Sequence, residues 1–165
     1  MRNMSGGTHL GRPVVLFLCT GNSCRSQMAE AFGKALGNEH FEFWSAGTAP
    51  ADQIHPLTIH VMAELGLDLR GQYPKSLVDA FARCDVRHLI TVCDGAGAAC
   101  PDVDAGITRD RWSLTDPAAF EGTADQRLAA FRAVRDEVGR LVREWLERSR
   151  GHNSRDARPQ ALRER

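Results

Sequence analysis

A short, continuously apolar run that leads straight into a cysteine and a polar loop is the feature that most constrains how this chain folds. Val14–Leu18 does not alternate between apolar and polar residues, which predicts a strand buried on both faces of a parallel sheet. Ser26–Leu36 carries apolar side chains at helical spacing, and Gly37 is expected to close that helix in a left-handed conformation. Residues 19–26 therefore form a tight connection between a central strand and a helix.

The rest of the chain alternates between apolar runs that suit strands and apolar spacings that suit helices. This alternation implies right-handed crossovers and helices on both faces of a parallel sheet. We expect the α/β class, with three α/β/α layers around a four-stranded parallel sheet. The elements after the first helix are expected at Phe41–Ser45 (strand), Pro56–Gly66 (helix), Ser76–Ala82 (helix), His88–Val92 (strand), Arg111–Ser113 (strand) and Ala124–Arg148 (helix, opened by a capping box of Thr123 and Gln126).

Length and charge bound the class of protein. The 165 residues suit one domain, which we place at residues 12–149, between a flexible segment (residues 1–11) and a disordered basic tail (residues 150–165). Because 21 Lys and Arg balance 21 Asp and Glu, we expect no nucleic-acid partner. No apolar window is long enough for a membrane span or a signal peptide, so we expect a cytoplasmic protein with no membrane attachment. We also expect a monomer.

The loop between the first strand and the first helix has the composition of an oxyanion site. Such a loop directs backbone N–H groups at one point, and the helix start adds unpaired N–H groups and the positive end of its dipole. Arg25 adds a planar fork of donors that fits a tetrahedral oxyanion, and the same field is expected to stabilise a reactive Cys19 thiolate. The residues expected to bind the oxyanion are Thr20, Gly21, Asn22, Ser23, Cys24, Arg25 and Ser26.

The cysteines raise the question of redox chemistry. Their odd number, five, argues against a secreted disulfide framework and for free thiols in a reducing compartment. Cys19 follows the first strand and Cys93 follows the third, so both thiols open onto one crevice if those strands are neighbours where the strand order reverses. Cys24 is expected to be structural and Cys84 inert.

The segment from Val15 to Glu30, VLFLCTGNSCRSQMAE, resembles the signature of the low-molecular-weight tyrosine phosphatase superfamily, in the version found in thioredoxin-coupled arsenate reductases. The resemblance covers roughly residues 13–148 and includes Ser45–Gly47 and Trp112–Pro117. It implies the low-molecular-weight phosphatase fold. In that family the aspartate before the proline is the general acid, which implies this role for Asp116; read alone, an Asp-Pro pair indicates only a turn.

The remaining cysteines distinguish the two enzyme classes that share this scaffold. A phosphatase needs only the loop and the acid, whereas a reductase needs thiols that carry oxidation away from the loop. Cys93 and Cys100 match the reductase pattern, and the small residues between them allow Cys93 to meet Cys19 in one state and Cys100 in another. The tyrosines that related phosphatases place after Asp-Pro are missing, because the single tyrosine is Tyr73.

The resemblance implies an arsenate reductase for arsenic detoxification, with arsenate, arsenite and phosphate-like oxyanions as ligands. Cys19 attacks arsenic while Asp116 protonates the departing oxygen, which gives a thiol–arsenic adduct. Cys93 then attacks Cys19 and arsenite leaves, after which Cys100 moves the disulfide to Cys93–Cys100. Thioredoxin is the expected partner and electron source, and no bound cofactor is expected.

Three other functions stay open. The first is a phosphatase that hydrolyses phosphate monoesters with Cys19, Arg25 and Asp116. The second is a reductase coupled to a small thiol such as mycothiol or glutathione, which needs no internal cysteine pair. The third is a redox-sensing or anion-binding module without turnover.

Metal sites are weakly indicated. The cysteines lack the two closely spaced ligand pairs of a structural zinc site. Some family members bind potassium near the loop through an Asn, a Glu, a Ser and an acidic residue. Asn22, Glu30 and Ser45 match three of these positions, but the acidic one falls near Ser76. The resemblance thus leaves only a weak potassium site.

Overall fold

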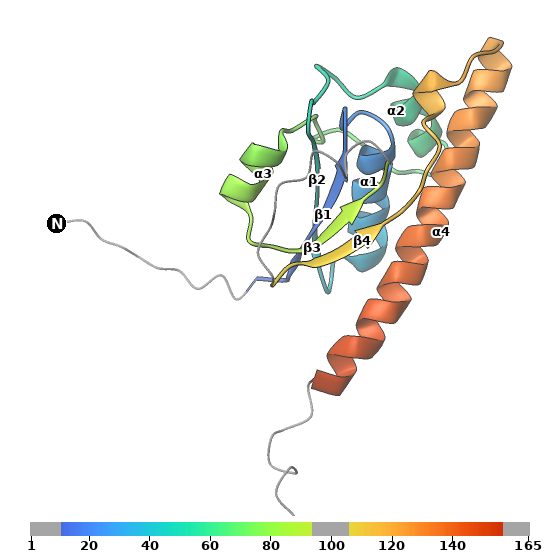
Figure 1. Ribbon diagram of the computed structural model, residues 1–165. Coiled ribbons are helices and arrows are strands. Elements are labelled where there is room, and N and C mark those ends of the chain that lie inside the picture. Colours follow the sequence, from blue (N-terminus) through green and yellow to red (C-terminus); the bar gives the residue numbers. More distant parts are fainter. Residues whose placement is uncertain (1–10, 94–105, 157–165) are drawn as a thin grey trace, which may run out of the picture.

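The computed structural model describes residues 11–93 and 106–156, with side chains as far as Gly151. Cys100, the first ten residues and residues 157–165 lie outside these ranges. The elements, drawn in Figure 1, are β1 (Val14–Cys19), α1 (Arg25–Gly37), β2 (Glu42–Gly47), α2 (Pro56–Ala63), α3 (Leu77–Arg83), β3 (Val86–Thr91), β4 (Thr108–Arg111), the 3-10 turn η2 (Pro117–Ala119) and α4 (Ala124–Asp156).

Four strands form one parallel sheet in the order β2-β1-β3-β4, which confirms the predicted class. Every residue of β1 is buried, as a strand paired on both edges and covered on both faces requires. The order reverses at β1, since β2 lies on one side and β3 on the other. Cys19 pairs with Gly47 of β2 and Leu18 with Thr91 of β3, so three strand ends meet there.

The helices lie on both sides of the sheet (Figure 1). α1 and α4 pack together on one side, α2 rests against α4, and α3 lies on the other side near β2. The buried core includes a cluster of aromatic rings. The Phe17 ring stacks on Phe43 with centroids 6.1 Å apart, and its centroid lies 5.7 Å from that of Trp112. Within the described residues, none of the helices has the length and apolar character of a membrane span.

Gly37 corrects the sequence prediction. The residue belongs to α1, and the cap after it, Asn38, is also right-handed, so no left-handed turn closes this helix. A β-carbon at Gly37 would lie 2.6 Å from Leu146 Cδ2, so a larger residue here would force the Leu146 side chain of α4 to move. Gly66, in contrast, has a φ of 73° and does close the turn after α2.

The boundaries of β4 and α4 also differ from the prediction. β4 begins at Thr108, earlier than the predicted Arg111, because this edge strand is polar and largely exposed and so gives no apolar signal. α4 is opened by the predicted reciprocal bonds of Thr123 and Gln126, at 3.0 and 3.2 Å. It continues to Asp156 instead of ending at Arg148, so the helix passes the expected domain boundary at residue 149.

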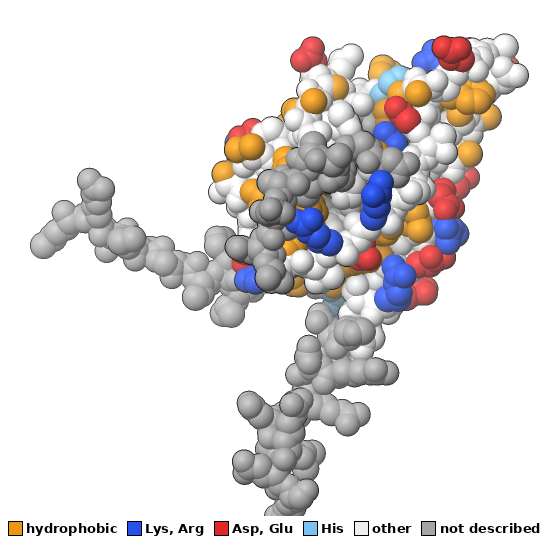
Figure 2. All heavy atoms as spheres, in the orientation of Figure 1, with side chains coloured by type: hydrophobic (Ala, Val, Ile, Leu, Met, Phe, Trp, Pro, Cys, Tyr) orange, Lys and Arg blue, Asp and Glu red, His pale blue; other side chains and the backbone are white. Residues whose placement is uncertain are grey.

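The outer side of α4 is strongly charged. Acidic and basic side chains are interspersed along it in Figure 2. Arg140 pairs with Glu137 and with Glu144, both at 2.5 Å. These partners are three and four positions away along the chain, the spacings at which side chains on one helix meet. Beyond these pairs, Arg150 donates to the Leu36 carbonyl (3.0 Å), which holds the last part of α4 against α1.

Candidate active site

The backbone of the loop after β1 is held from outside by the segment that follows β2. Cys19, Thr20, Gly21 and Ser23 each turn their carbonyl toward that segment. Four hydrogen bonds result, donated by the backbone N–H of Thr48 to Cys19 (3.1 Å), Ala49 to Thr20 (3.0 Å), Ala51 to Gly21 (2.8 Å) and His55 to Ser23 (3.0 Å). With its carbonyls engaged there, the loop is left with a fixed backbone conformation.

Gly47, at the end of β2, makes this contact sterically possible. A β-carbon on Gly47 would lie 2.4 Å from the carbonyl oxygen of Thr20, a distance that real side chains do not tolerate. In the sequence, only the resemblance points to Ser45–Gly47. The close approach of Gly47 to the loop explains why a glycine is required in this segment.

Asn22 is the central residue of the loop. It is fully buried and has a φ of 50°, a left-handed conformation that Asn tolerates better than most residues. Its carboxamide Oδ1 accepts a bond from the backbone N–H of Lys75 (2.8 Å), and its Nδ2 donates to Ser26 Oγ (2.8 Å). Its own carbonyl accepts from Gln27 Nε2 (2.9 Å). Asn22 thus ties the loop to α1 and to the segment before α3.

The Cys19 sulfur is buried, with 3% of the residue exposed, and lies at the focus of the loop. The backbone N–H of Asn22 donates to Sγ at 3.0 Å, and Ser26 Oγ lies 2.8 Å away. Ser26 Oγ also accepts a hydrogen bond from Asn22 Nδ2, and when Cys19 is a thiolate the Ser26 hydroxyl is the donor to sulfur, because a thiolate can only accept. Both contacts therefore favour the thiolate form of Cys19.

Burial nevertheless raises the pKa of the Cys19 thiol above its ordinary value. The Ser26 hydroxyl, the Asn22 N–H and the Arg25 charge each lower this pKa, while the neighbouring Cys93 raises it. The loop therefore acts on the thiolate in the expected direction, but removal from water is the largest influence on this pKa.

Arg25 and Asp116 face each other at the rim. Arg25 begins α1, and its Nη1 donates to the carbonyl of Leu114 (2.9 Å). Its Nη2 lies 3.9 Å from Asp116 Oδ2. Asp116 caps the 3-10 turn by accepting from the Ala118 N–H (3.0 Å), and its side chain is 44% exposed. The structure thus places the predicted clamp and the predicted acid side by side, at the open edge of the loop.

Cys93 lies next to the same loop. The Val92 N–H donates to the Leu18 carbonyl (2.9 Å), so the chain leaves β3 alongside the start of the loop. Cys93 Sγ lies 3.8 Å from Thr20 Oγ1, and Cys93 is 3% exposed. Cys19, Cys24, Cys84 and Cys93 are all free thiols. Cys100, the predicted third thiol of the relay, lies outside the described residues.

The other predicted loop residues occupy different environments. Thr20 is exposed at the rim, and Ser23 Oγ lies 3.7 Å from Cys24 Sγ rather than near Cys19. Burial raises the pKa of the Cys24 thiol, which suits a structural residue. Sequence reasoning missed the support from residues 48–55 and from Lys75, because contacts between distant segments leave no local pattern.

The residues matched to a potassium site do not fit that ion. Ser45 Oγ donates to Glu30 Oε2, but Lys75 Nζ lies 3.5 Å from the same oxygen and Lys34 Nζ lies 2.6 Å from Oε1. A potassium ion bound at Glu30 would be repelled by these two ammonium groups, because two like unit charges about 4 Å apart repel by about 4 kcal/mol at an effective dielectric constant of about 20. Elsewhere too, the described residues form no group of three or more His, Cys, Asp or Glu suited to a metal.

Fold and site together define an α/β protein in which a central parallel strand leads into a Cys-x5-Arg loop at the start of a helix. The chain belongs to the low molecular weight phosphotyrosine protein phosphatase family, whose sequence pattern matches residues 14–155. This confirms the resemblance and the fold class inferred from the sequence.

Similar proteins within this family carry a more specific name than the family does. An arsenate reductase of Shouchella clausii is 37% identical over 139 residues, which cover 84% of this chain and 98% of that protein. A thioredoxin-dependent arsenate reductase of Corynebacterium glutamicum has a similar structure (TM-score 0.69, 30% identity, 86% of this chain); this chain spans 64% of its length. An arsenate reductase solved in a phosphate-binding state aligns with a TM-score of 0.66, 31% identity, and coverage of 82% and 98%.

Proposed function

We propose that the chain is an arsenate reductase that forms arsenite and takes its electrons from thioredoxin. One observation carries the proposal beyond a phosphatase: Cys93 emerges from β3 beside the loop that holds Cys19. A phosphatase has no use for a second thiol there, whereas a reductase requires one. The arsenate reductases among the relatives support this choice.

In the first step the Cys19 thiolate attacks arsenic. The loop and Arg25 hold the arsenate oxygens, and the Ser26 hydroxyl and the Asn22 N–H stabilise the attacking sulfur. Asp116 gives its proton to the departing oxygen, which leaves as water, and a bond between sulfur and pentavalent arsenic remains. Asp116 suits this role because it lies exposed at the rim beside Arg25.

In the second step Cys93 attacks the Cys19 sulfur. A Cys19–Cys93 disulfide forms, the electron pair of the sulfur–arsenic bond passes to arsenic, and trivalent arsenite leaves. Thr20 Oγ1, 3.8 Å from Cys93 Sγ, is positioned to hold that thiol toward the loop.

In the third step Cys100 attacks Cys93 and releases Cys19 as a thiolate. The Cys93–Cys100 disulfide is then reduced by the dithiol of thioredoxin, which ends as a disulfide itself. This step rests on the sequence, where Cys100 follows Cys93 across a run of small residues. No bound cofactor takes part in the cycle.

The remaining expectations accompany this proposal. We keep the catalytic domain at residues 12–149, with the last part of α4 extending beyond it to Asp156. We propose a cytoplasmic monomer that binds oxyanions, without nucleic-acid or membrane partners. Hydrolysis of a small aryl phosphate is expected as a side activity, because Cys19, Arg25 and Asp116 also suit phosphate esters.

The test is arsenate-dependent NADPH oxidation coupled through thioredoxin and thioredoxin reductase. Cys19→Ser and Cys93→Ser should abolish turnover, and Cys100→Ser should allow about one turnover. Cys84→Ser is the matched control and should keep full activity, since Cys84 lies away from the loop beyond α3. Sustained turnover by Cys93→Ser would contradict the relay. Aryl phosphate hydrolysis without any arsenate reduction would favour the phosphatase.

A further inference from the structure

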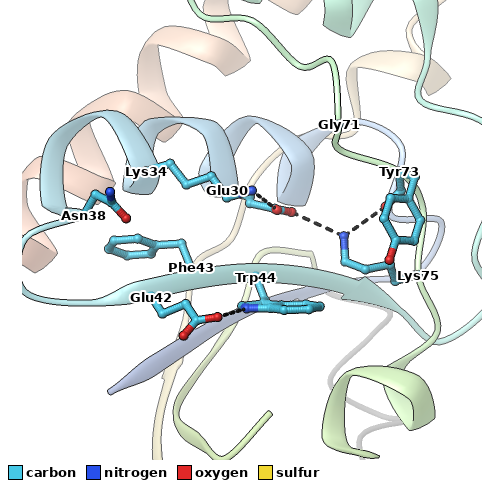
Figure 3. Close-up of a pocket in the computed structure, with 9 residues that line it drawn as sticks. All are labelled: Glu30, Lys34, Asn38, Glu42, Phe43, Trp44, Gly71, Tyr73 and Lys75. Carbon is cyan, nitrogen blue, oxygen red and sulfur yellow. Dashed lines mark hydrogen bonds and ion pairs between the residues drawn. The ribbon is translucent and has the colours of Figure 1, made fainter. Parts of the chain in front are cut away.

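Lys75 carries a buried charge for which the chemistry proposed above has no use. The residue is 7% exposed, and its Nζ donates to the Tyr73 carbonyl (3.0 Å) and lies 3.5 Å from Glu30 Oε2. Figure 3 shows the ammonium group between these two partners, at the end of a hollow of about 240 Å³. A lysine is rarely buried unless its charge is paired, so its position calls for an explanation.

We propose that Lys75 is a positioning residue whose tethered ammonium replaces a bound monovalent cation beneath the oxyanion loop. The chain then has no requirement for potassium, although it keeps the Asn, Glu and Ser that matched such a site. The inference rests on Cys19 being the nucleophile, as in the proposed function, but it makes its own claim about what holds the loop.

The surroundings of the ammonium are those of a cation site. Glu30 is 3% exposed, and its Oε2 is shared by Ser45 Oγ and Lys75 Nζ. The Tyr73 and Trp44 rings offer their faces to the ammonium, with centroids 4.8 and 6.0 Å from Nζ. Carboxylate, carbonyl and aromatic faces all favour positive charge, and Lys75 supplies it from within the chain.

The backbone of Lys75 connects this charge to the loop. Its N–H donates to Asn22 Oδ1 (2.8 Å), and its carbonyl accepts from the Gly47 N–H (2.8 Å). Asn22 in turn holds Ser26, whose hydroxyl contacts the Cys19 sulfur. Fixing the Lys75 side chain on Glu30 therefore fixes the backbone group that orients Asn22.

A second lysine that pairs with Glu30, Lys34, provides a control. Lys34 Nζ lies 2.6 Å from Glu30 Oε1, but its side chain is 46% exposed and it does not contact the loop. Removing Lys34 takes away one positive charge near the same carboxylate without touching Asn22. A pure effect of charge on Glu30 would appear in both variants, whereas a positioning role would appear in Lys75 variants alone.

The experiment measures thermal melting and the rate of Cys19 alkylation by iodoacetamide in potassium, sodium or tetramethylammonium chloride at equal ionic strength. Cys24→Ser, Cys84→Ser, Cys93→Ser and Cys100→Ser are made together, so that Cys19 is the reporting thiol. In this background the protein with Lys75 should give the same values in all three salts. Lys75→Ala should melt several degrees lower and be alkylated roughly tenfold more slowly in tetramethylammonium. Potassium, which the hollow of Figure 3 admits, should recover part of both losses.

Lys34→Met should leave the alkylation rate unchanged in every salt. Lys75→Met, whose longer side chain fills the space, should show the same losses as Lys75→Ala without recovery by potassium. A potassium-specific gain in the protein that keeps Lys75, or Lys75→Ala values that no salt alters, would overturn the inference. Because neither readout uses arsenate, these outcomes are independent of whether the chain reduces it.

Discussion

The Ser26 hydroxyl lies 2.8 Å from the Cys19 sulfur, and Asn22 Nδ2 holds it there by donating a hydrogen bond to its oxygen. The hydroxyl therefore stabilises the thiolate more than the thiol. Burial opposes it and raises the pKa of Cys19. The reactivity of this cysteine is set by the difference between these two effects.

Ser26→Ala should raise the pKa of Cys19 further, since the variant removes a contact that lowers it. The thiolate then forms only at higher pH, so the pH profile of Cys19 alkylation moves upward. At a fixed pH below the pKa of Cys19, a roughly tenfold higher affinity of the Cys19 thiolate for its proton should slow alkylation roughly tenfold. The rate is measured with iodoacetamide in a background where the other cysteines are serine.

Ser23→Ala is the control for this change. It also removes a loop hydroxyl, but one that lies near Cys24 rather than Cys19. Its alkylation profile should match that of the parent protein. An unchanged profile in Ser26→Ala would mean that the Ser26 hydroxyl does not stabilise the thiolate.

Asp116→Asn should slow formation of the arsenic adduct while leaving oxyanion binding nearly intact. The carboxyl group touches Arg25 at the rim, and its removal frees the guanidinium without displacing it, since Leu114 still accepts from Nη1. Loss of a general acid costs about 100- to 10,000-fold in rate. Single-turnover kinetics and protection of Cys19 by phosphate separate the two effects. A large loss of phosphate protection would argue for a binding role instead.

Gly47→Ala should distort the loop. The new methyl group would meet the Thr20 carbonyl, which is backbone and cannot rotate away. Overpacking of this kind costs about 1–3 kcal/mol, or several degrees in melting temperature, and here it should also weaken phosphate binding. Gly106→Ala is the control, because no atom of the described residues lies within 4 Å of its added β-carbon. Equal phosphate affinity in both variants would show that the close approach is not needed.

Glu64 should make stability depend on pH in the acid range. Arg132 donates to its carboxylate and Arg135 pairs with it at 2.9 Å, which lowers the pKa of Glu64 to about 2 from about 4.5. A lowered pKa contributes stability that is complete above about 4.5 and is lost as the pH falls toward 2. Glu64→Gln should therefore lose stability at neutral pH, and its difference from the parent should vanish near pH 2.

Urea unfolding at a series of pH values measures this difference. Glu144→Gln removes a carboxylate that pairs only within α4, at Arg140. That control should change stability little at any pH, because exposed pairs on one helix contribute little. A constant Glu64→Gln difference across the whole range would contradict the assigned role.

The parts of this molecule that the sequence predicted are those written in consecutive residues. Val14–Leu18 and the Cys19–Arg25 loop could be assigned because a continuous apolar run and a strand-to-helix junction leave local patterns. The predicted position of the fourth strand, Arg111–Ser113, lies too far along the chain, because the residues of β4 are polar and the apolar Trp112 follows them. The burial of Lys75 had no pattern at all, because a lysine becomes a core residue only when a carboxylate and two rings from other segments surround it.

The four hydrogen bonds between the Cys19 loop and residues 48–55 have a consequence for how electrons are delivered. With its loop carbonyls tied down and 3% of its surface exposed, Cys19 is sheltered from any reductant the size of a protein. In the proposed cycle a disulfide formed at this sulfur is therefore opened by a thiol of the same chain. The rigidity that prepares Cys19 for attack also shields it, and because Cys93 is itself 3% exposed, the proposed transfer to thioredoxin depends on Cys100.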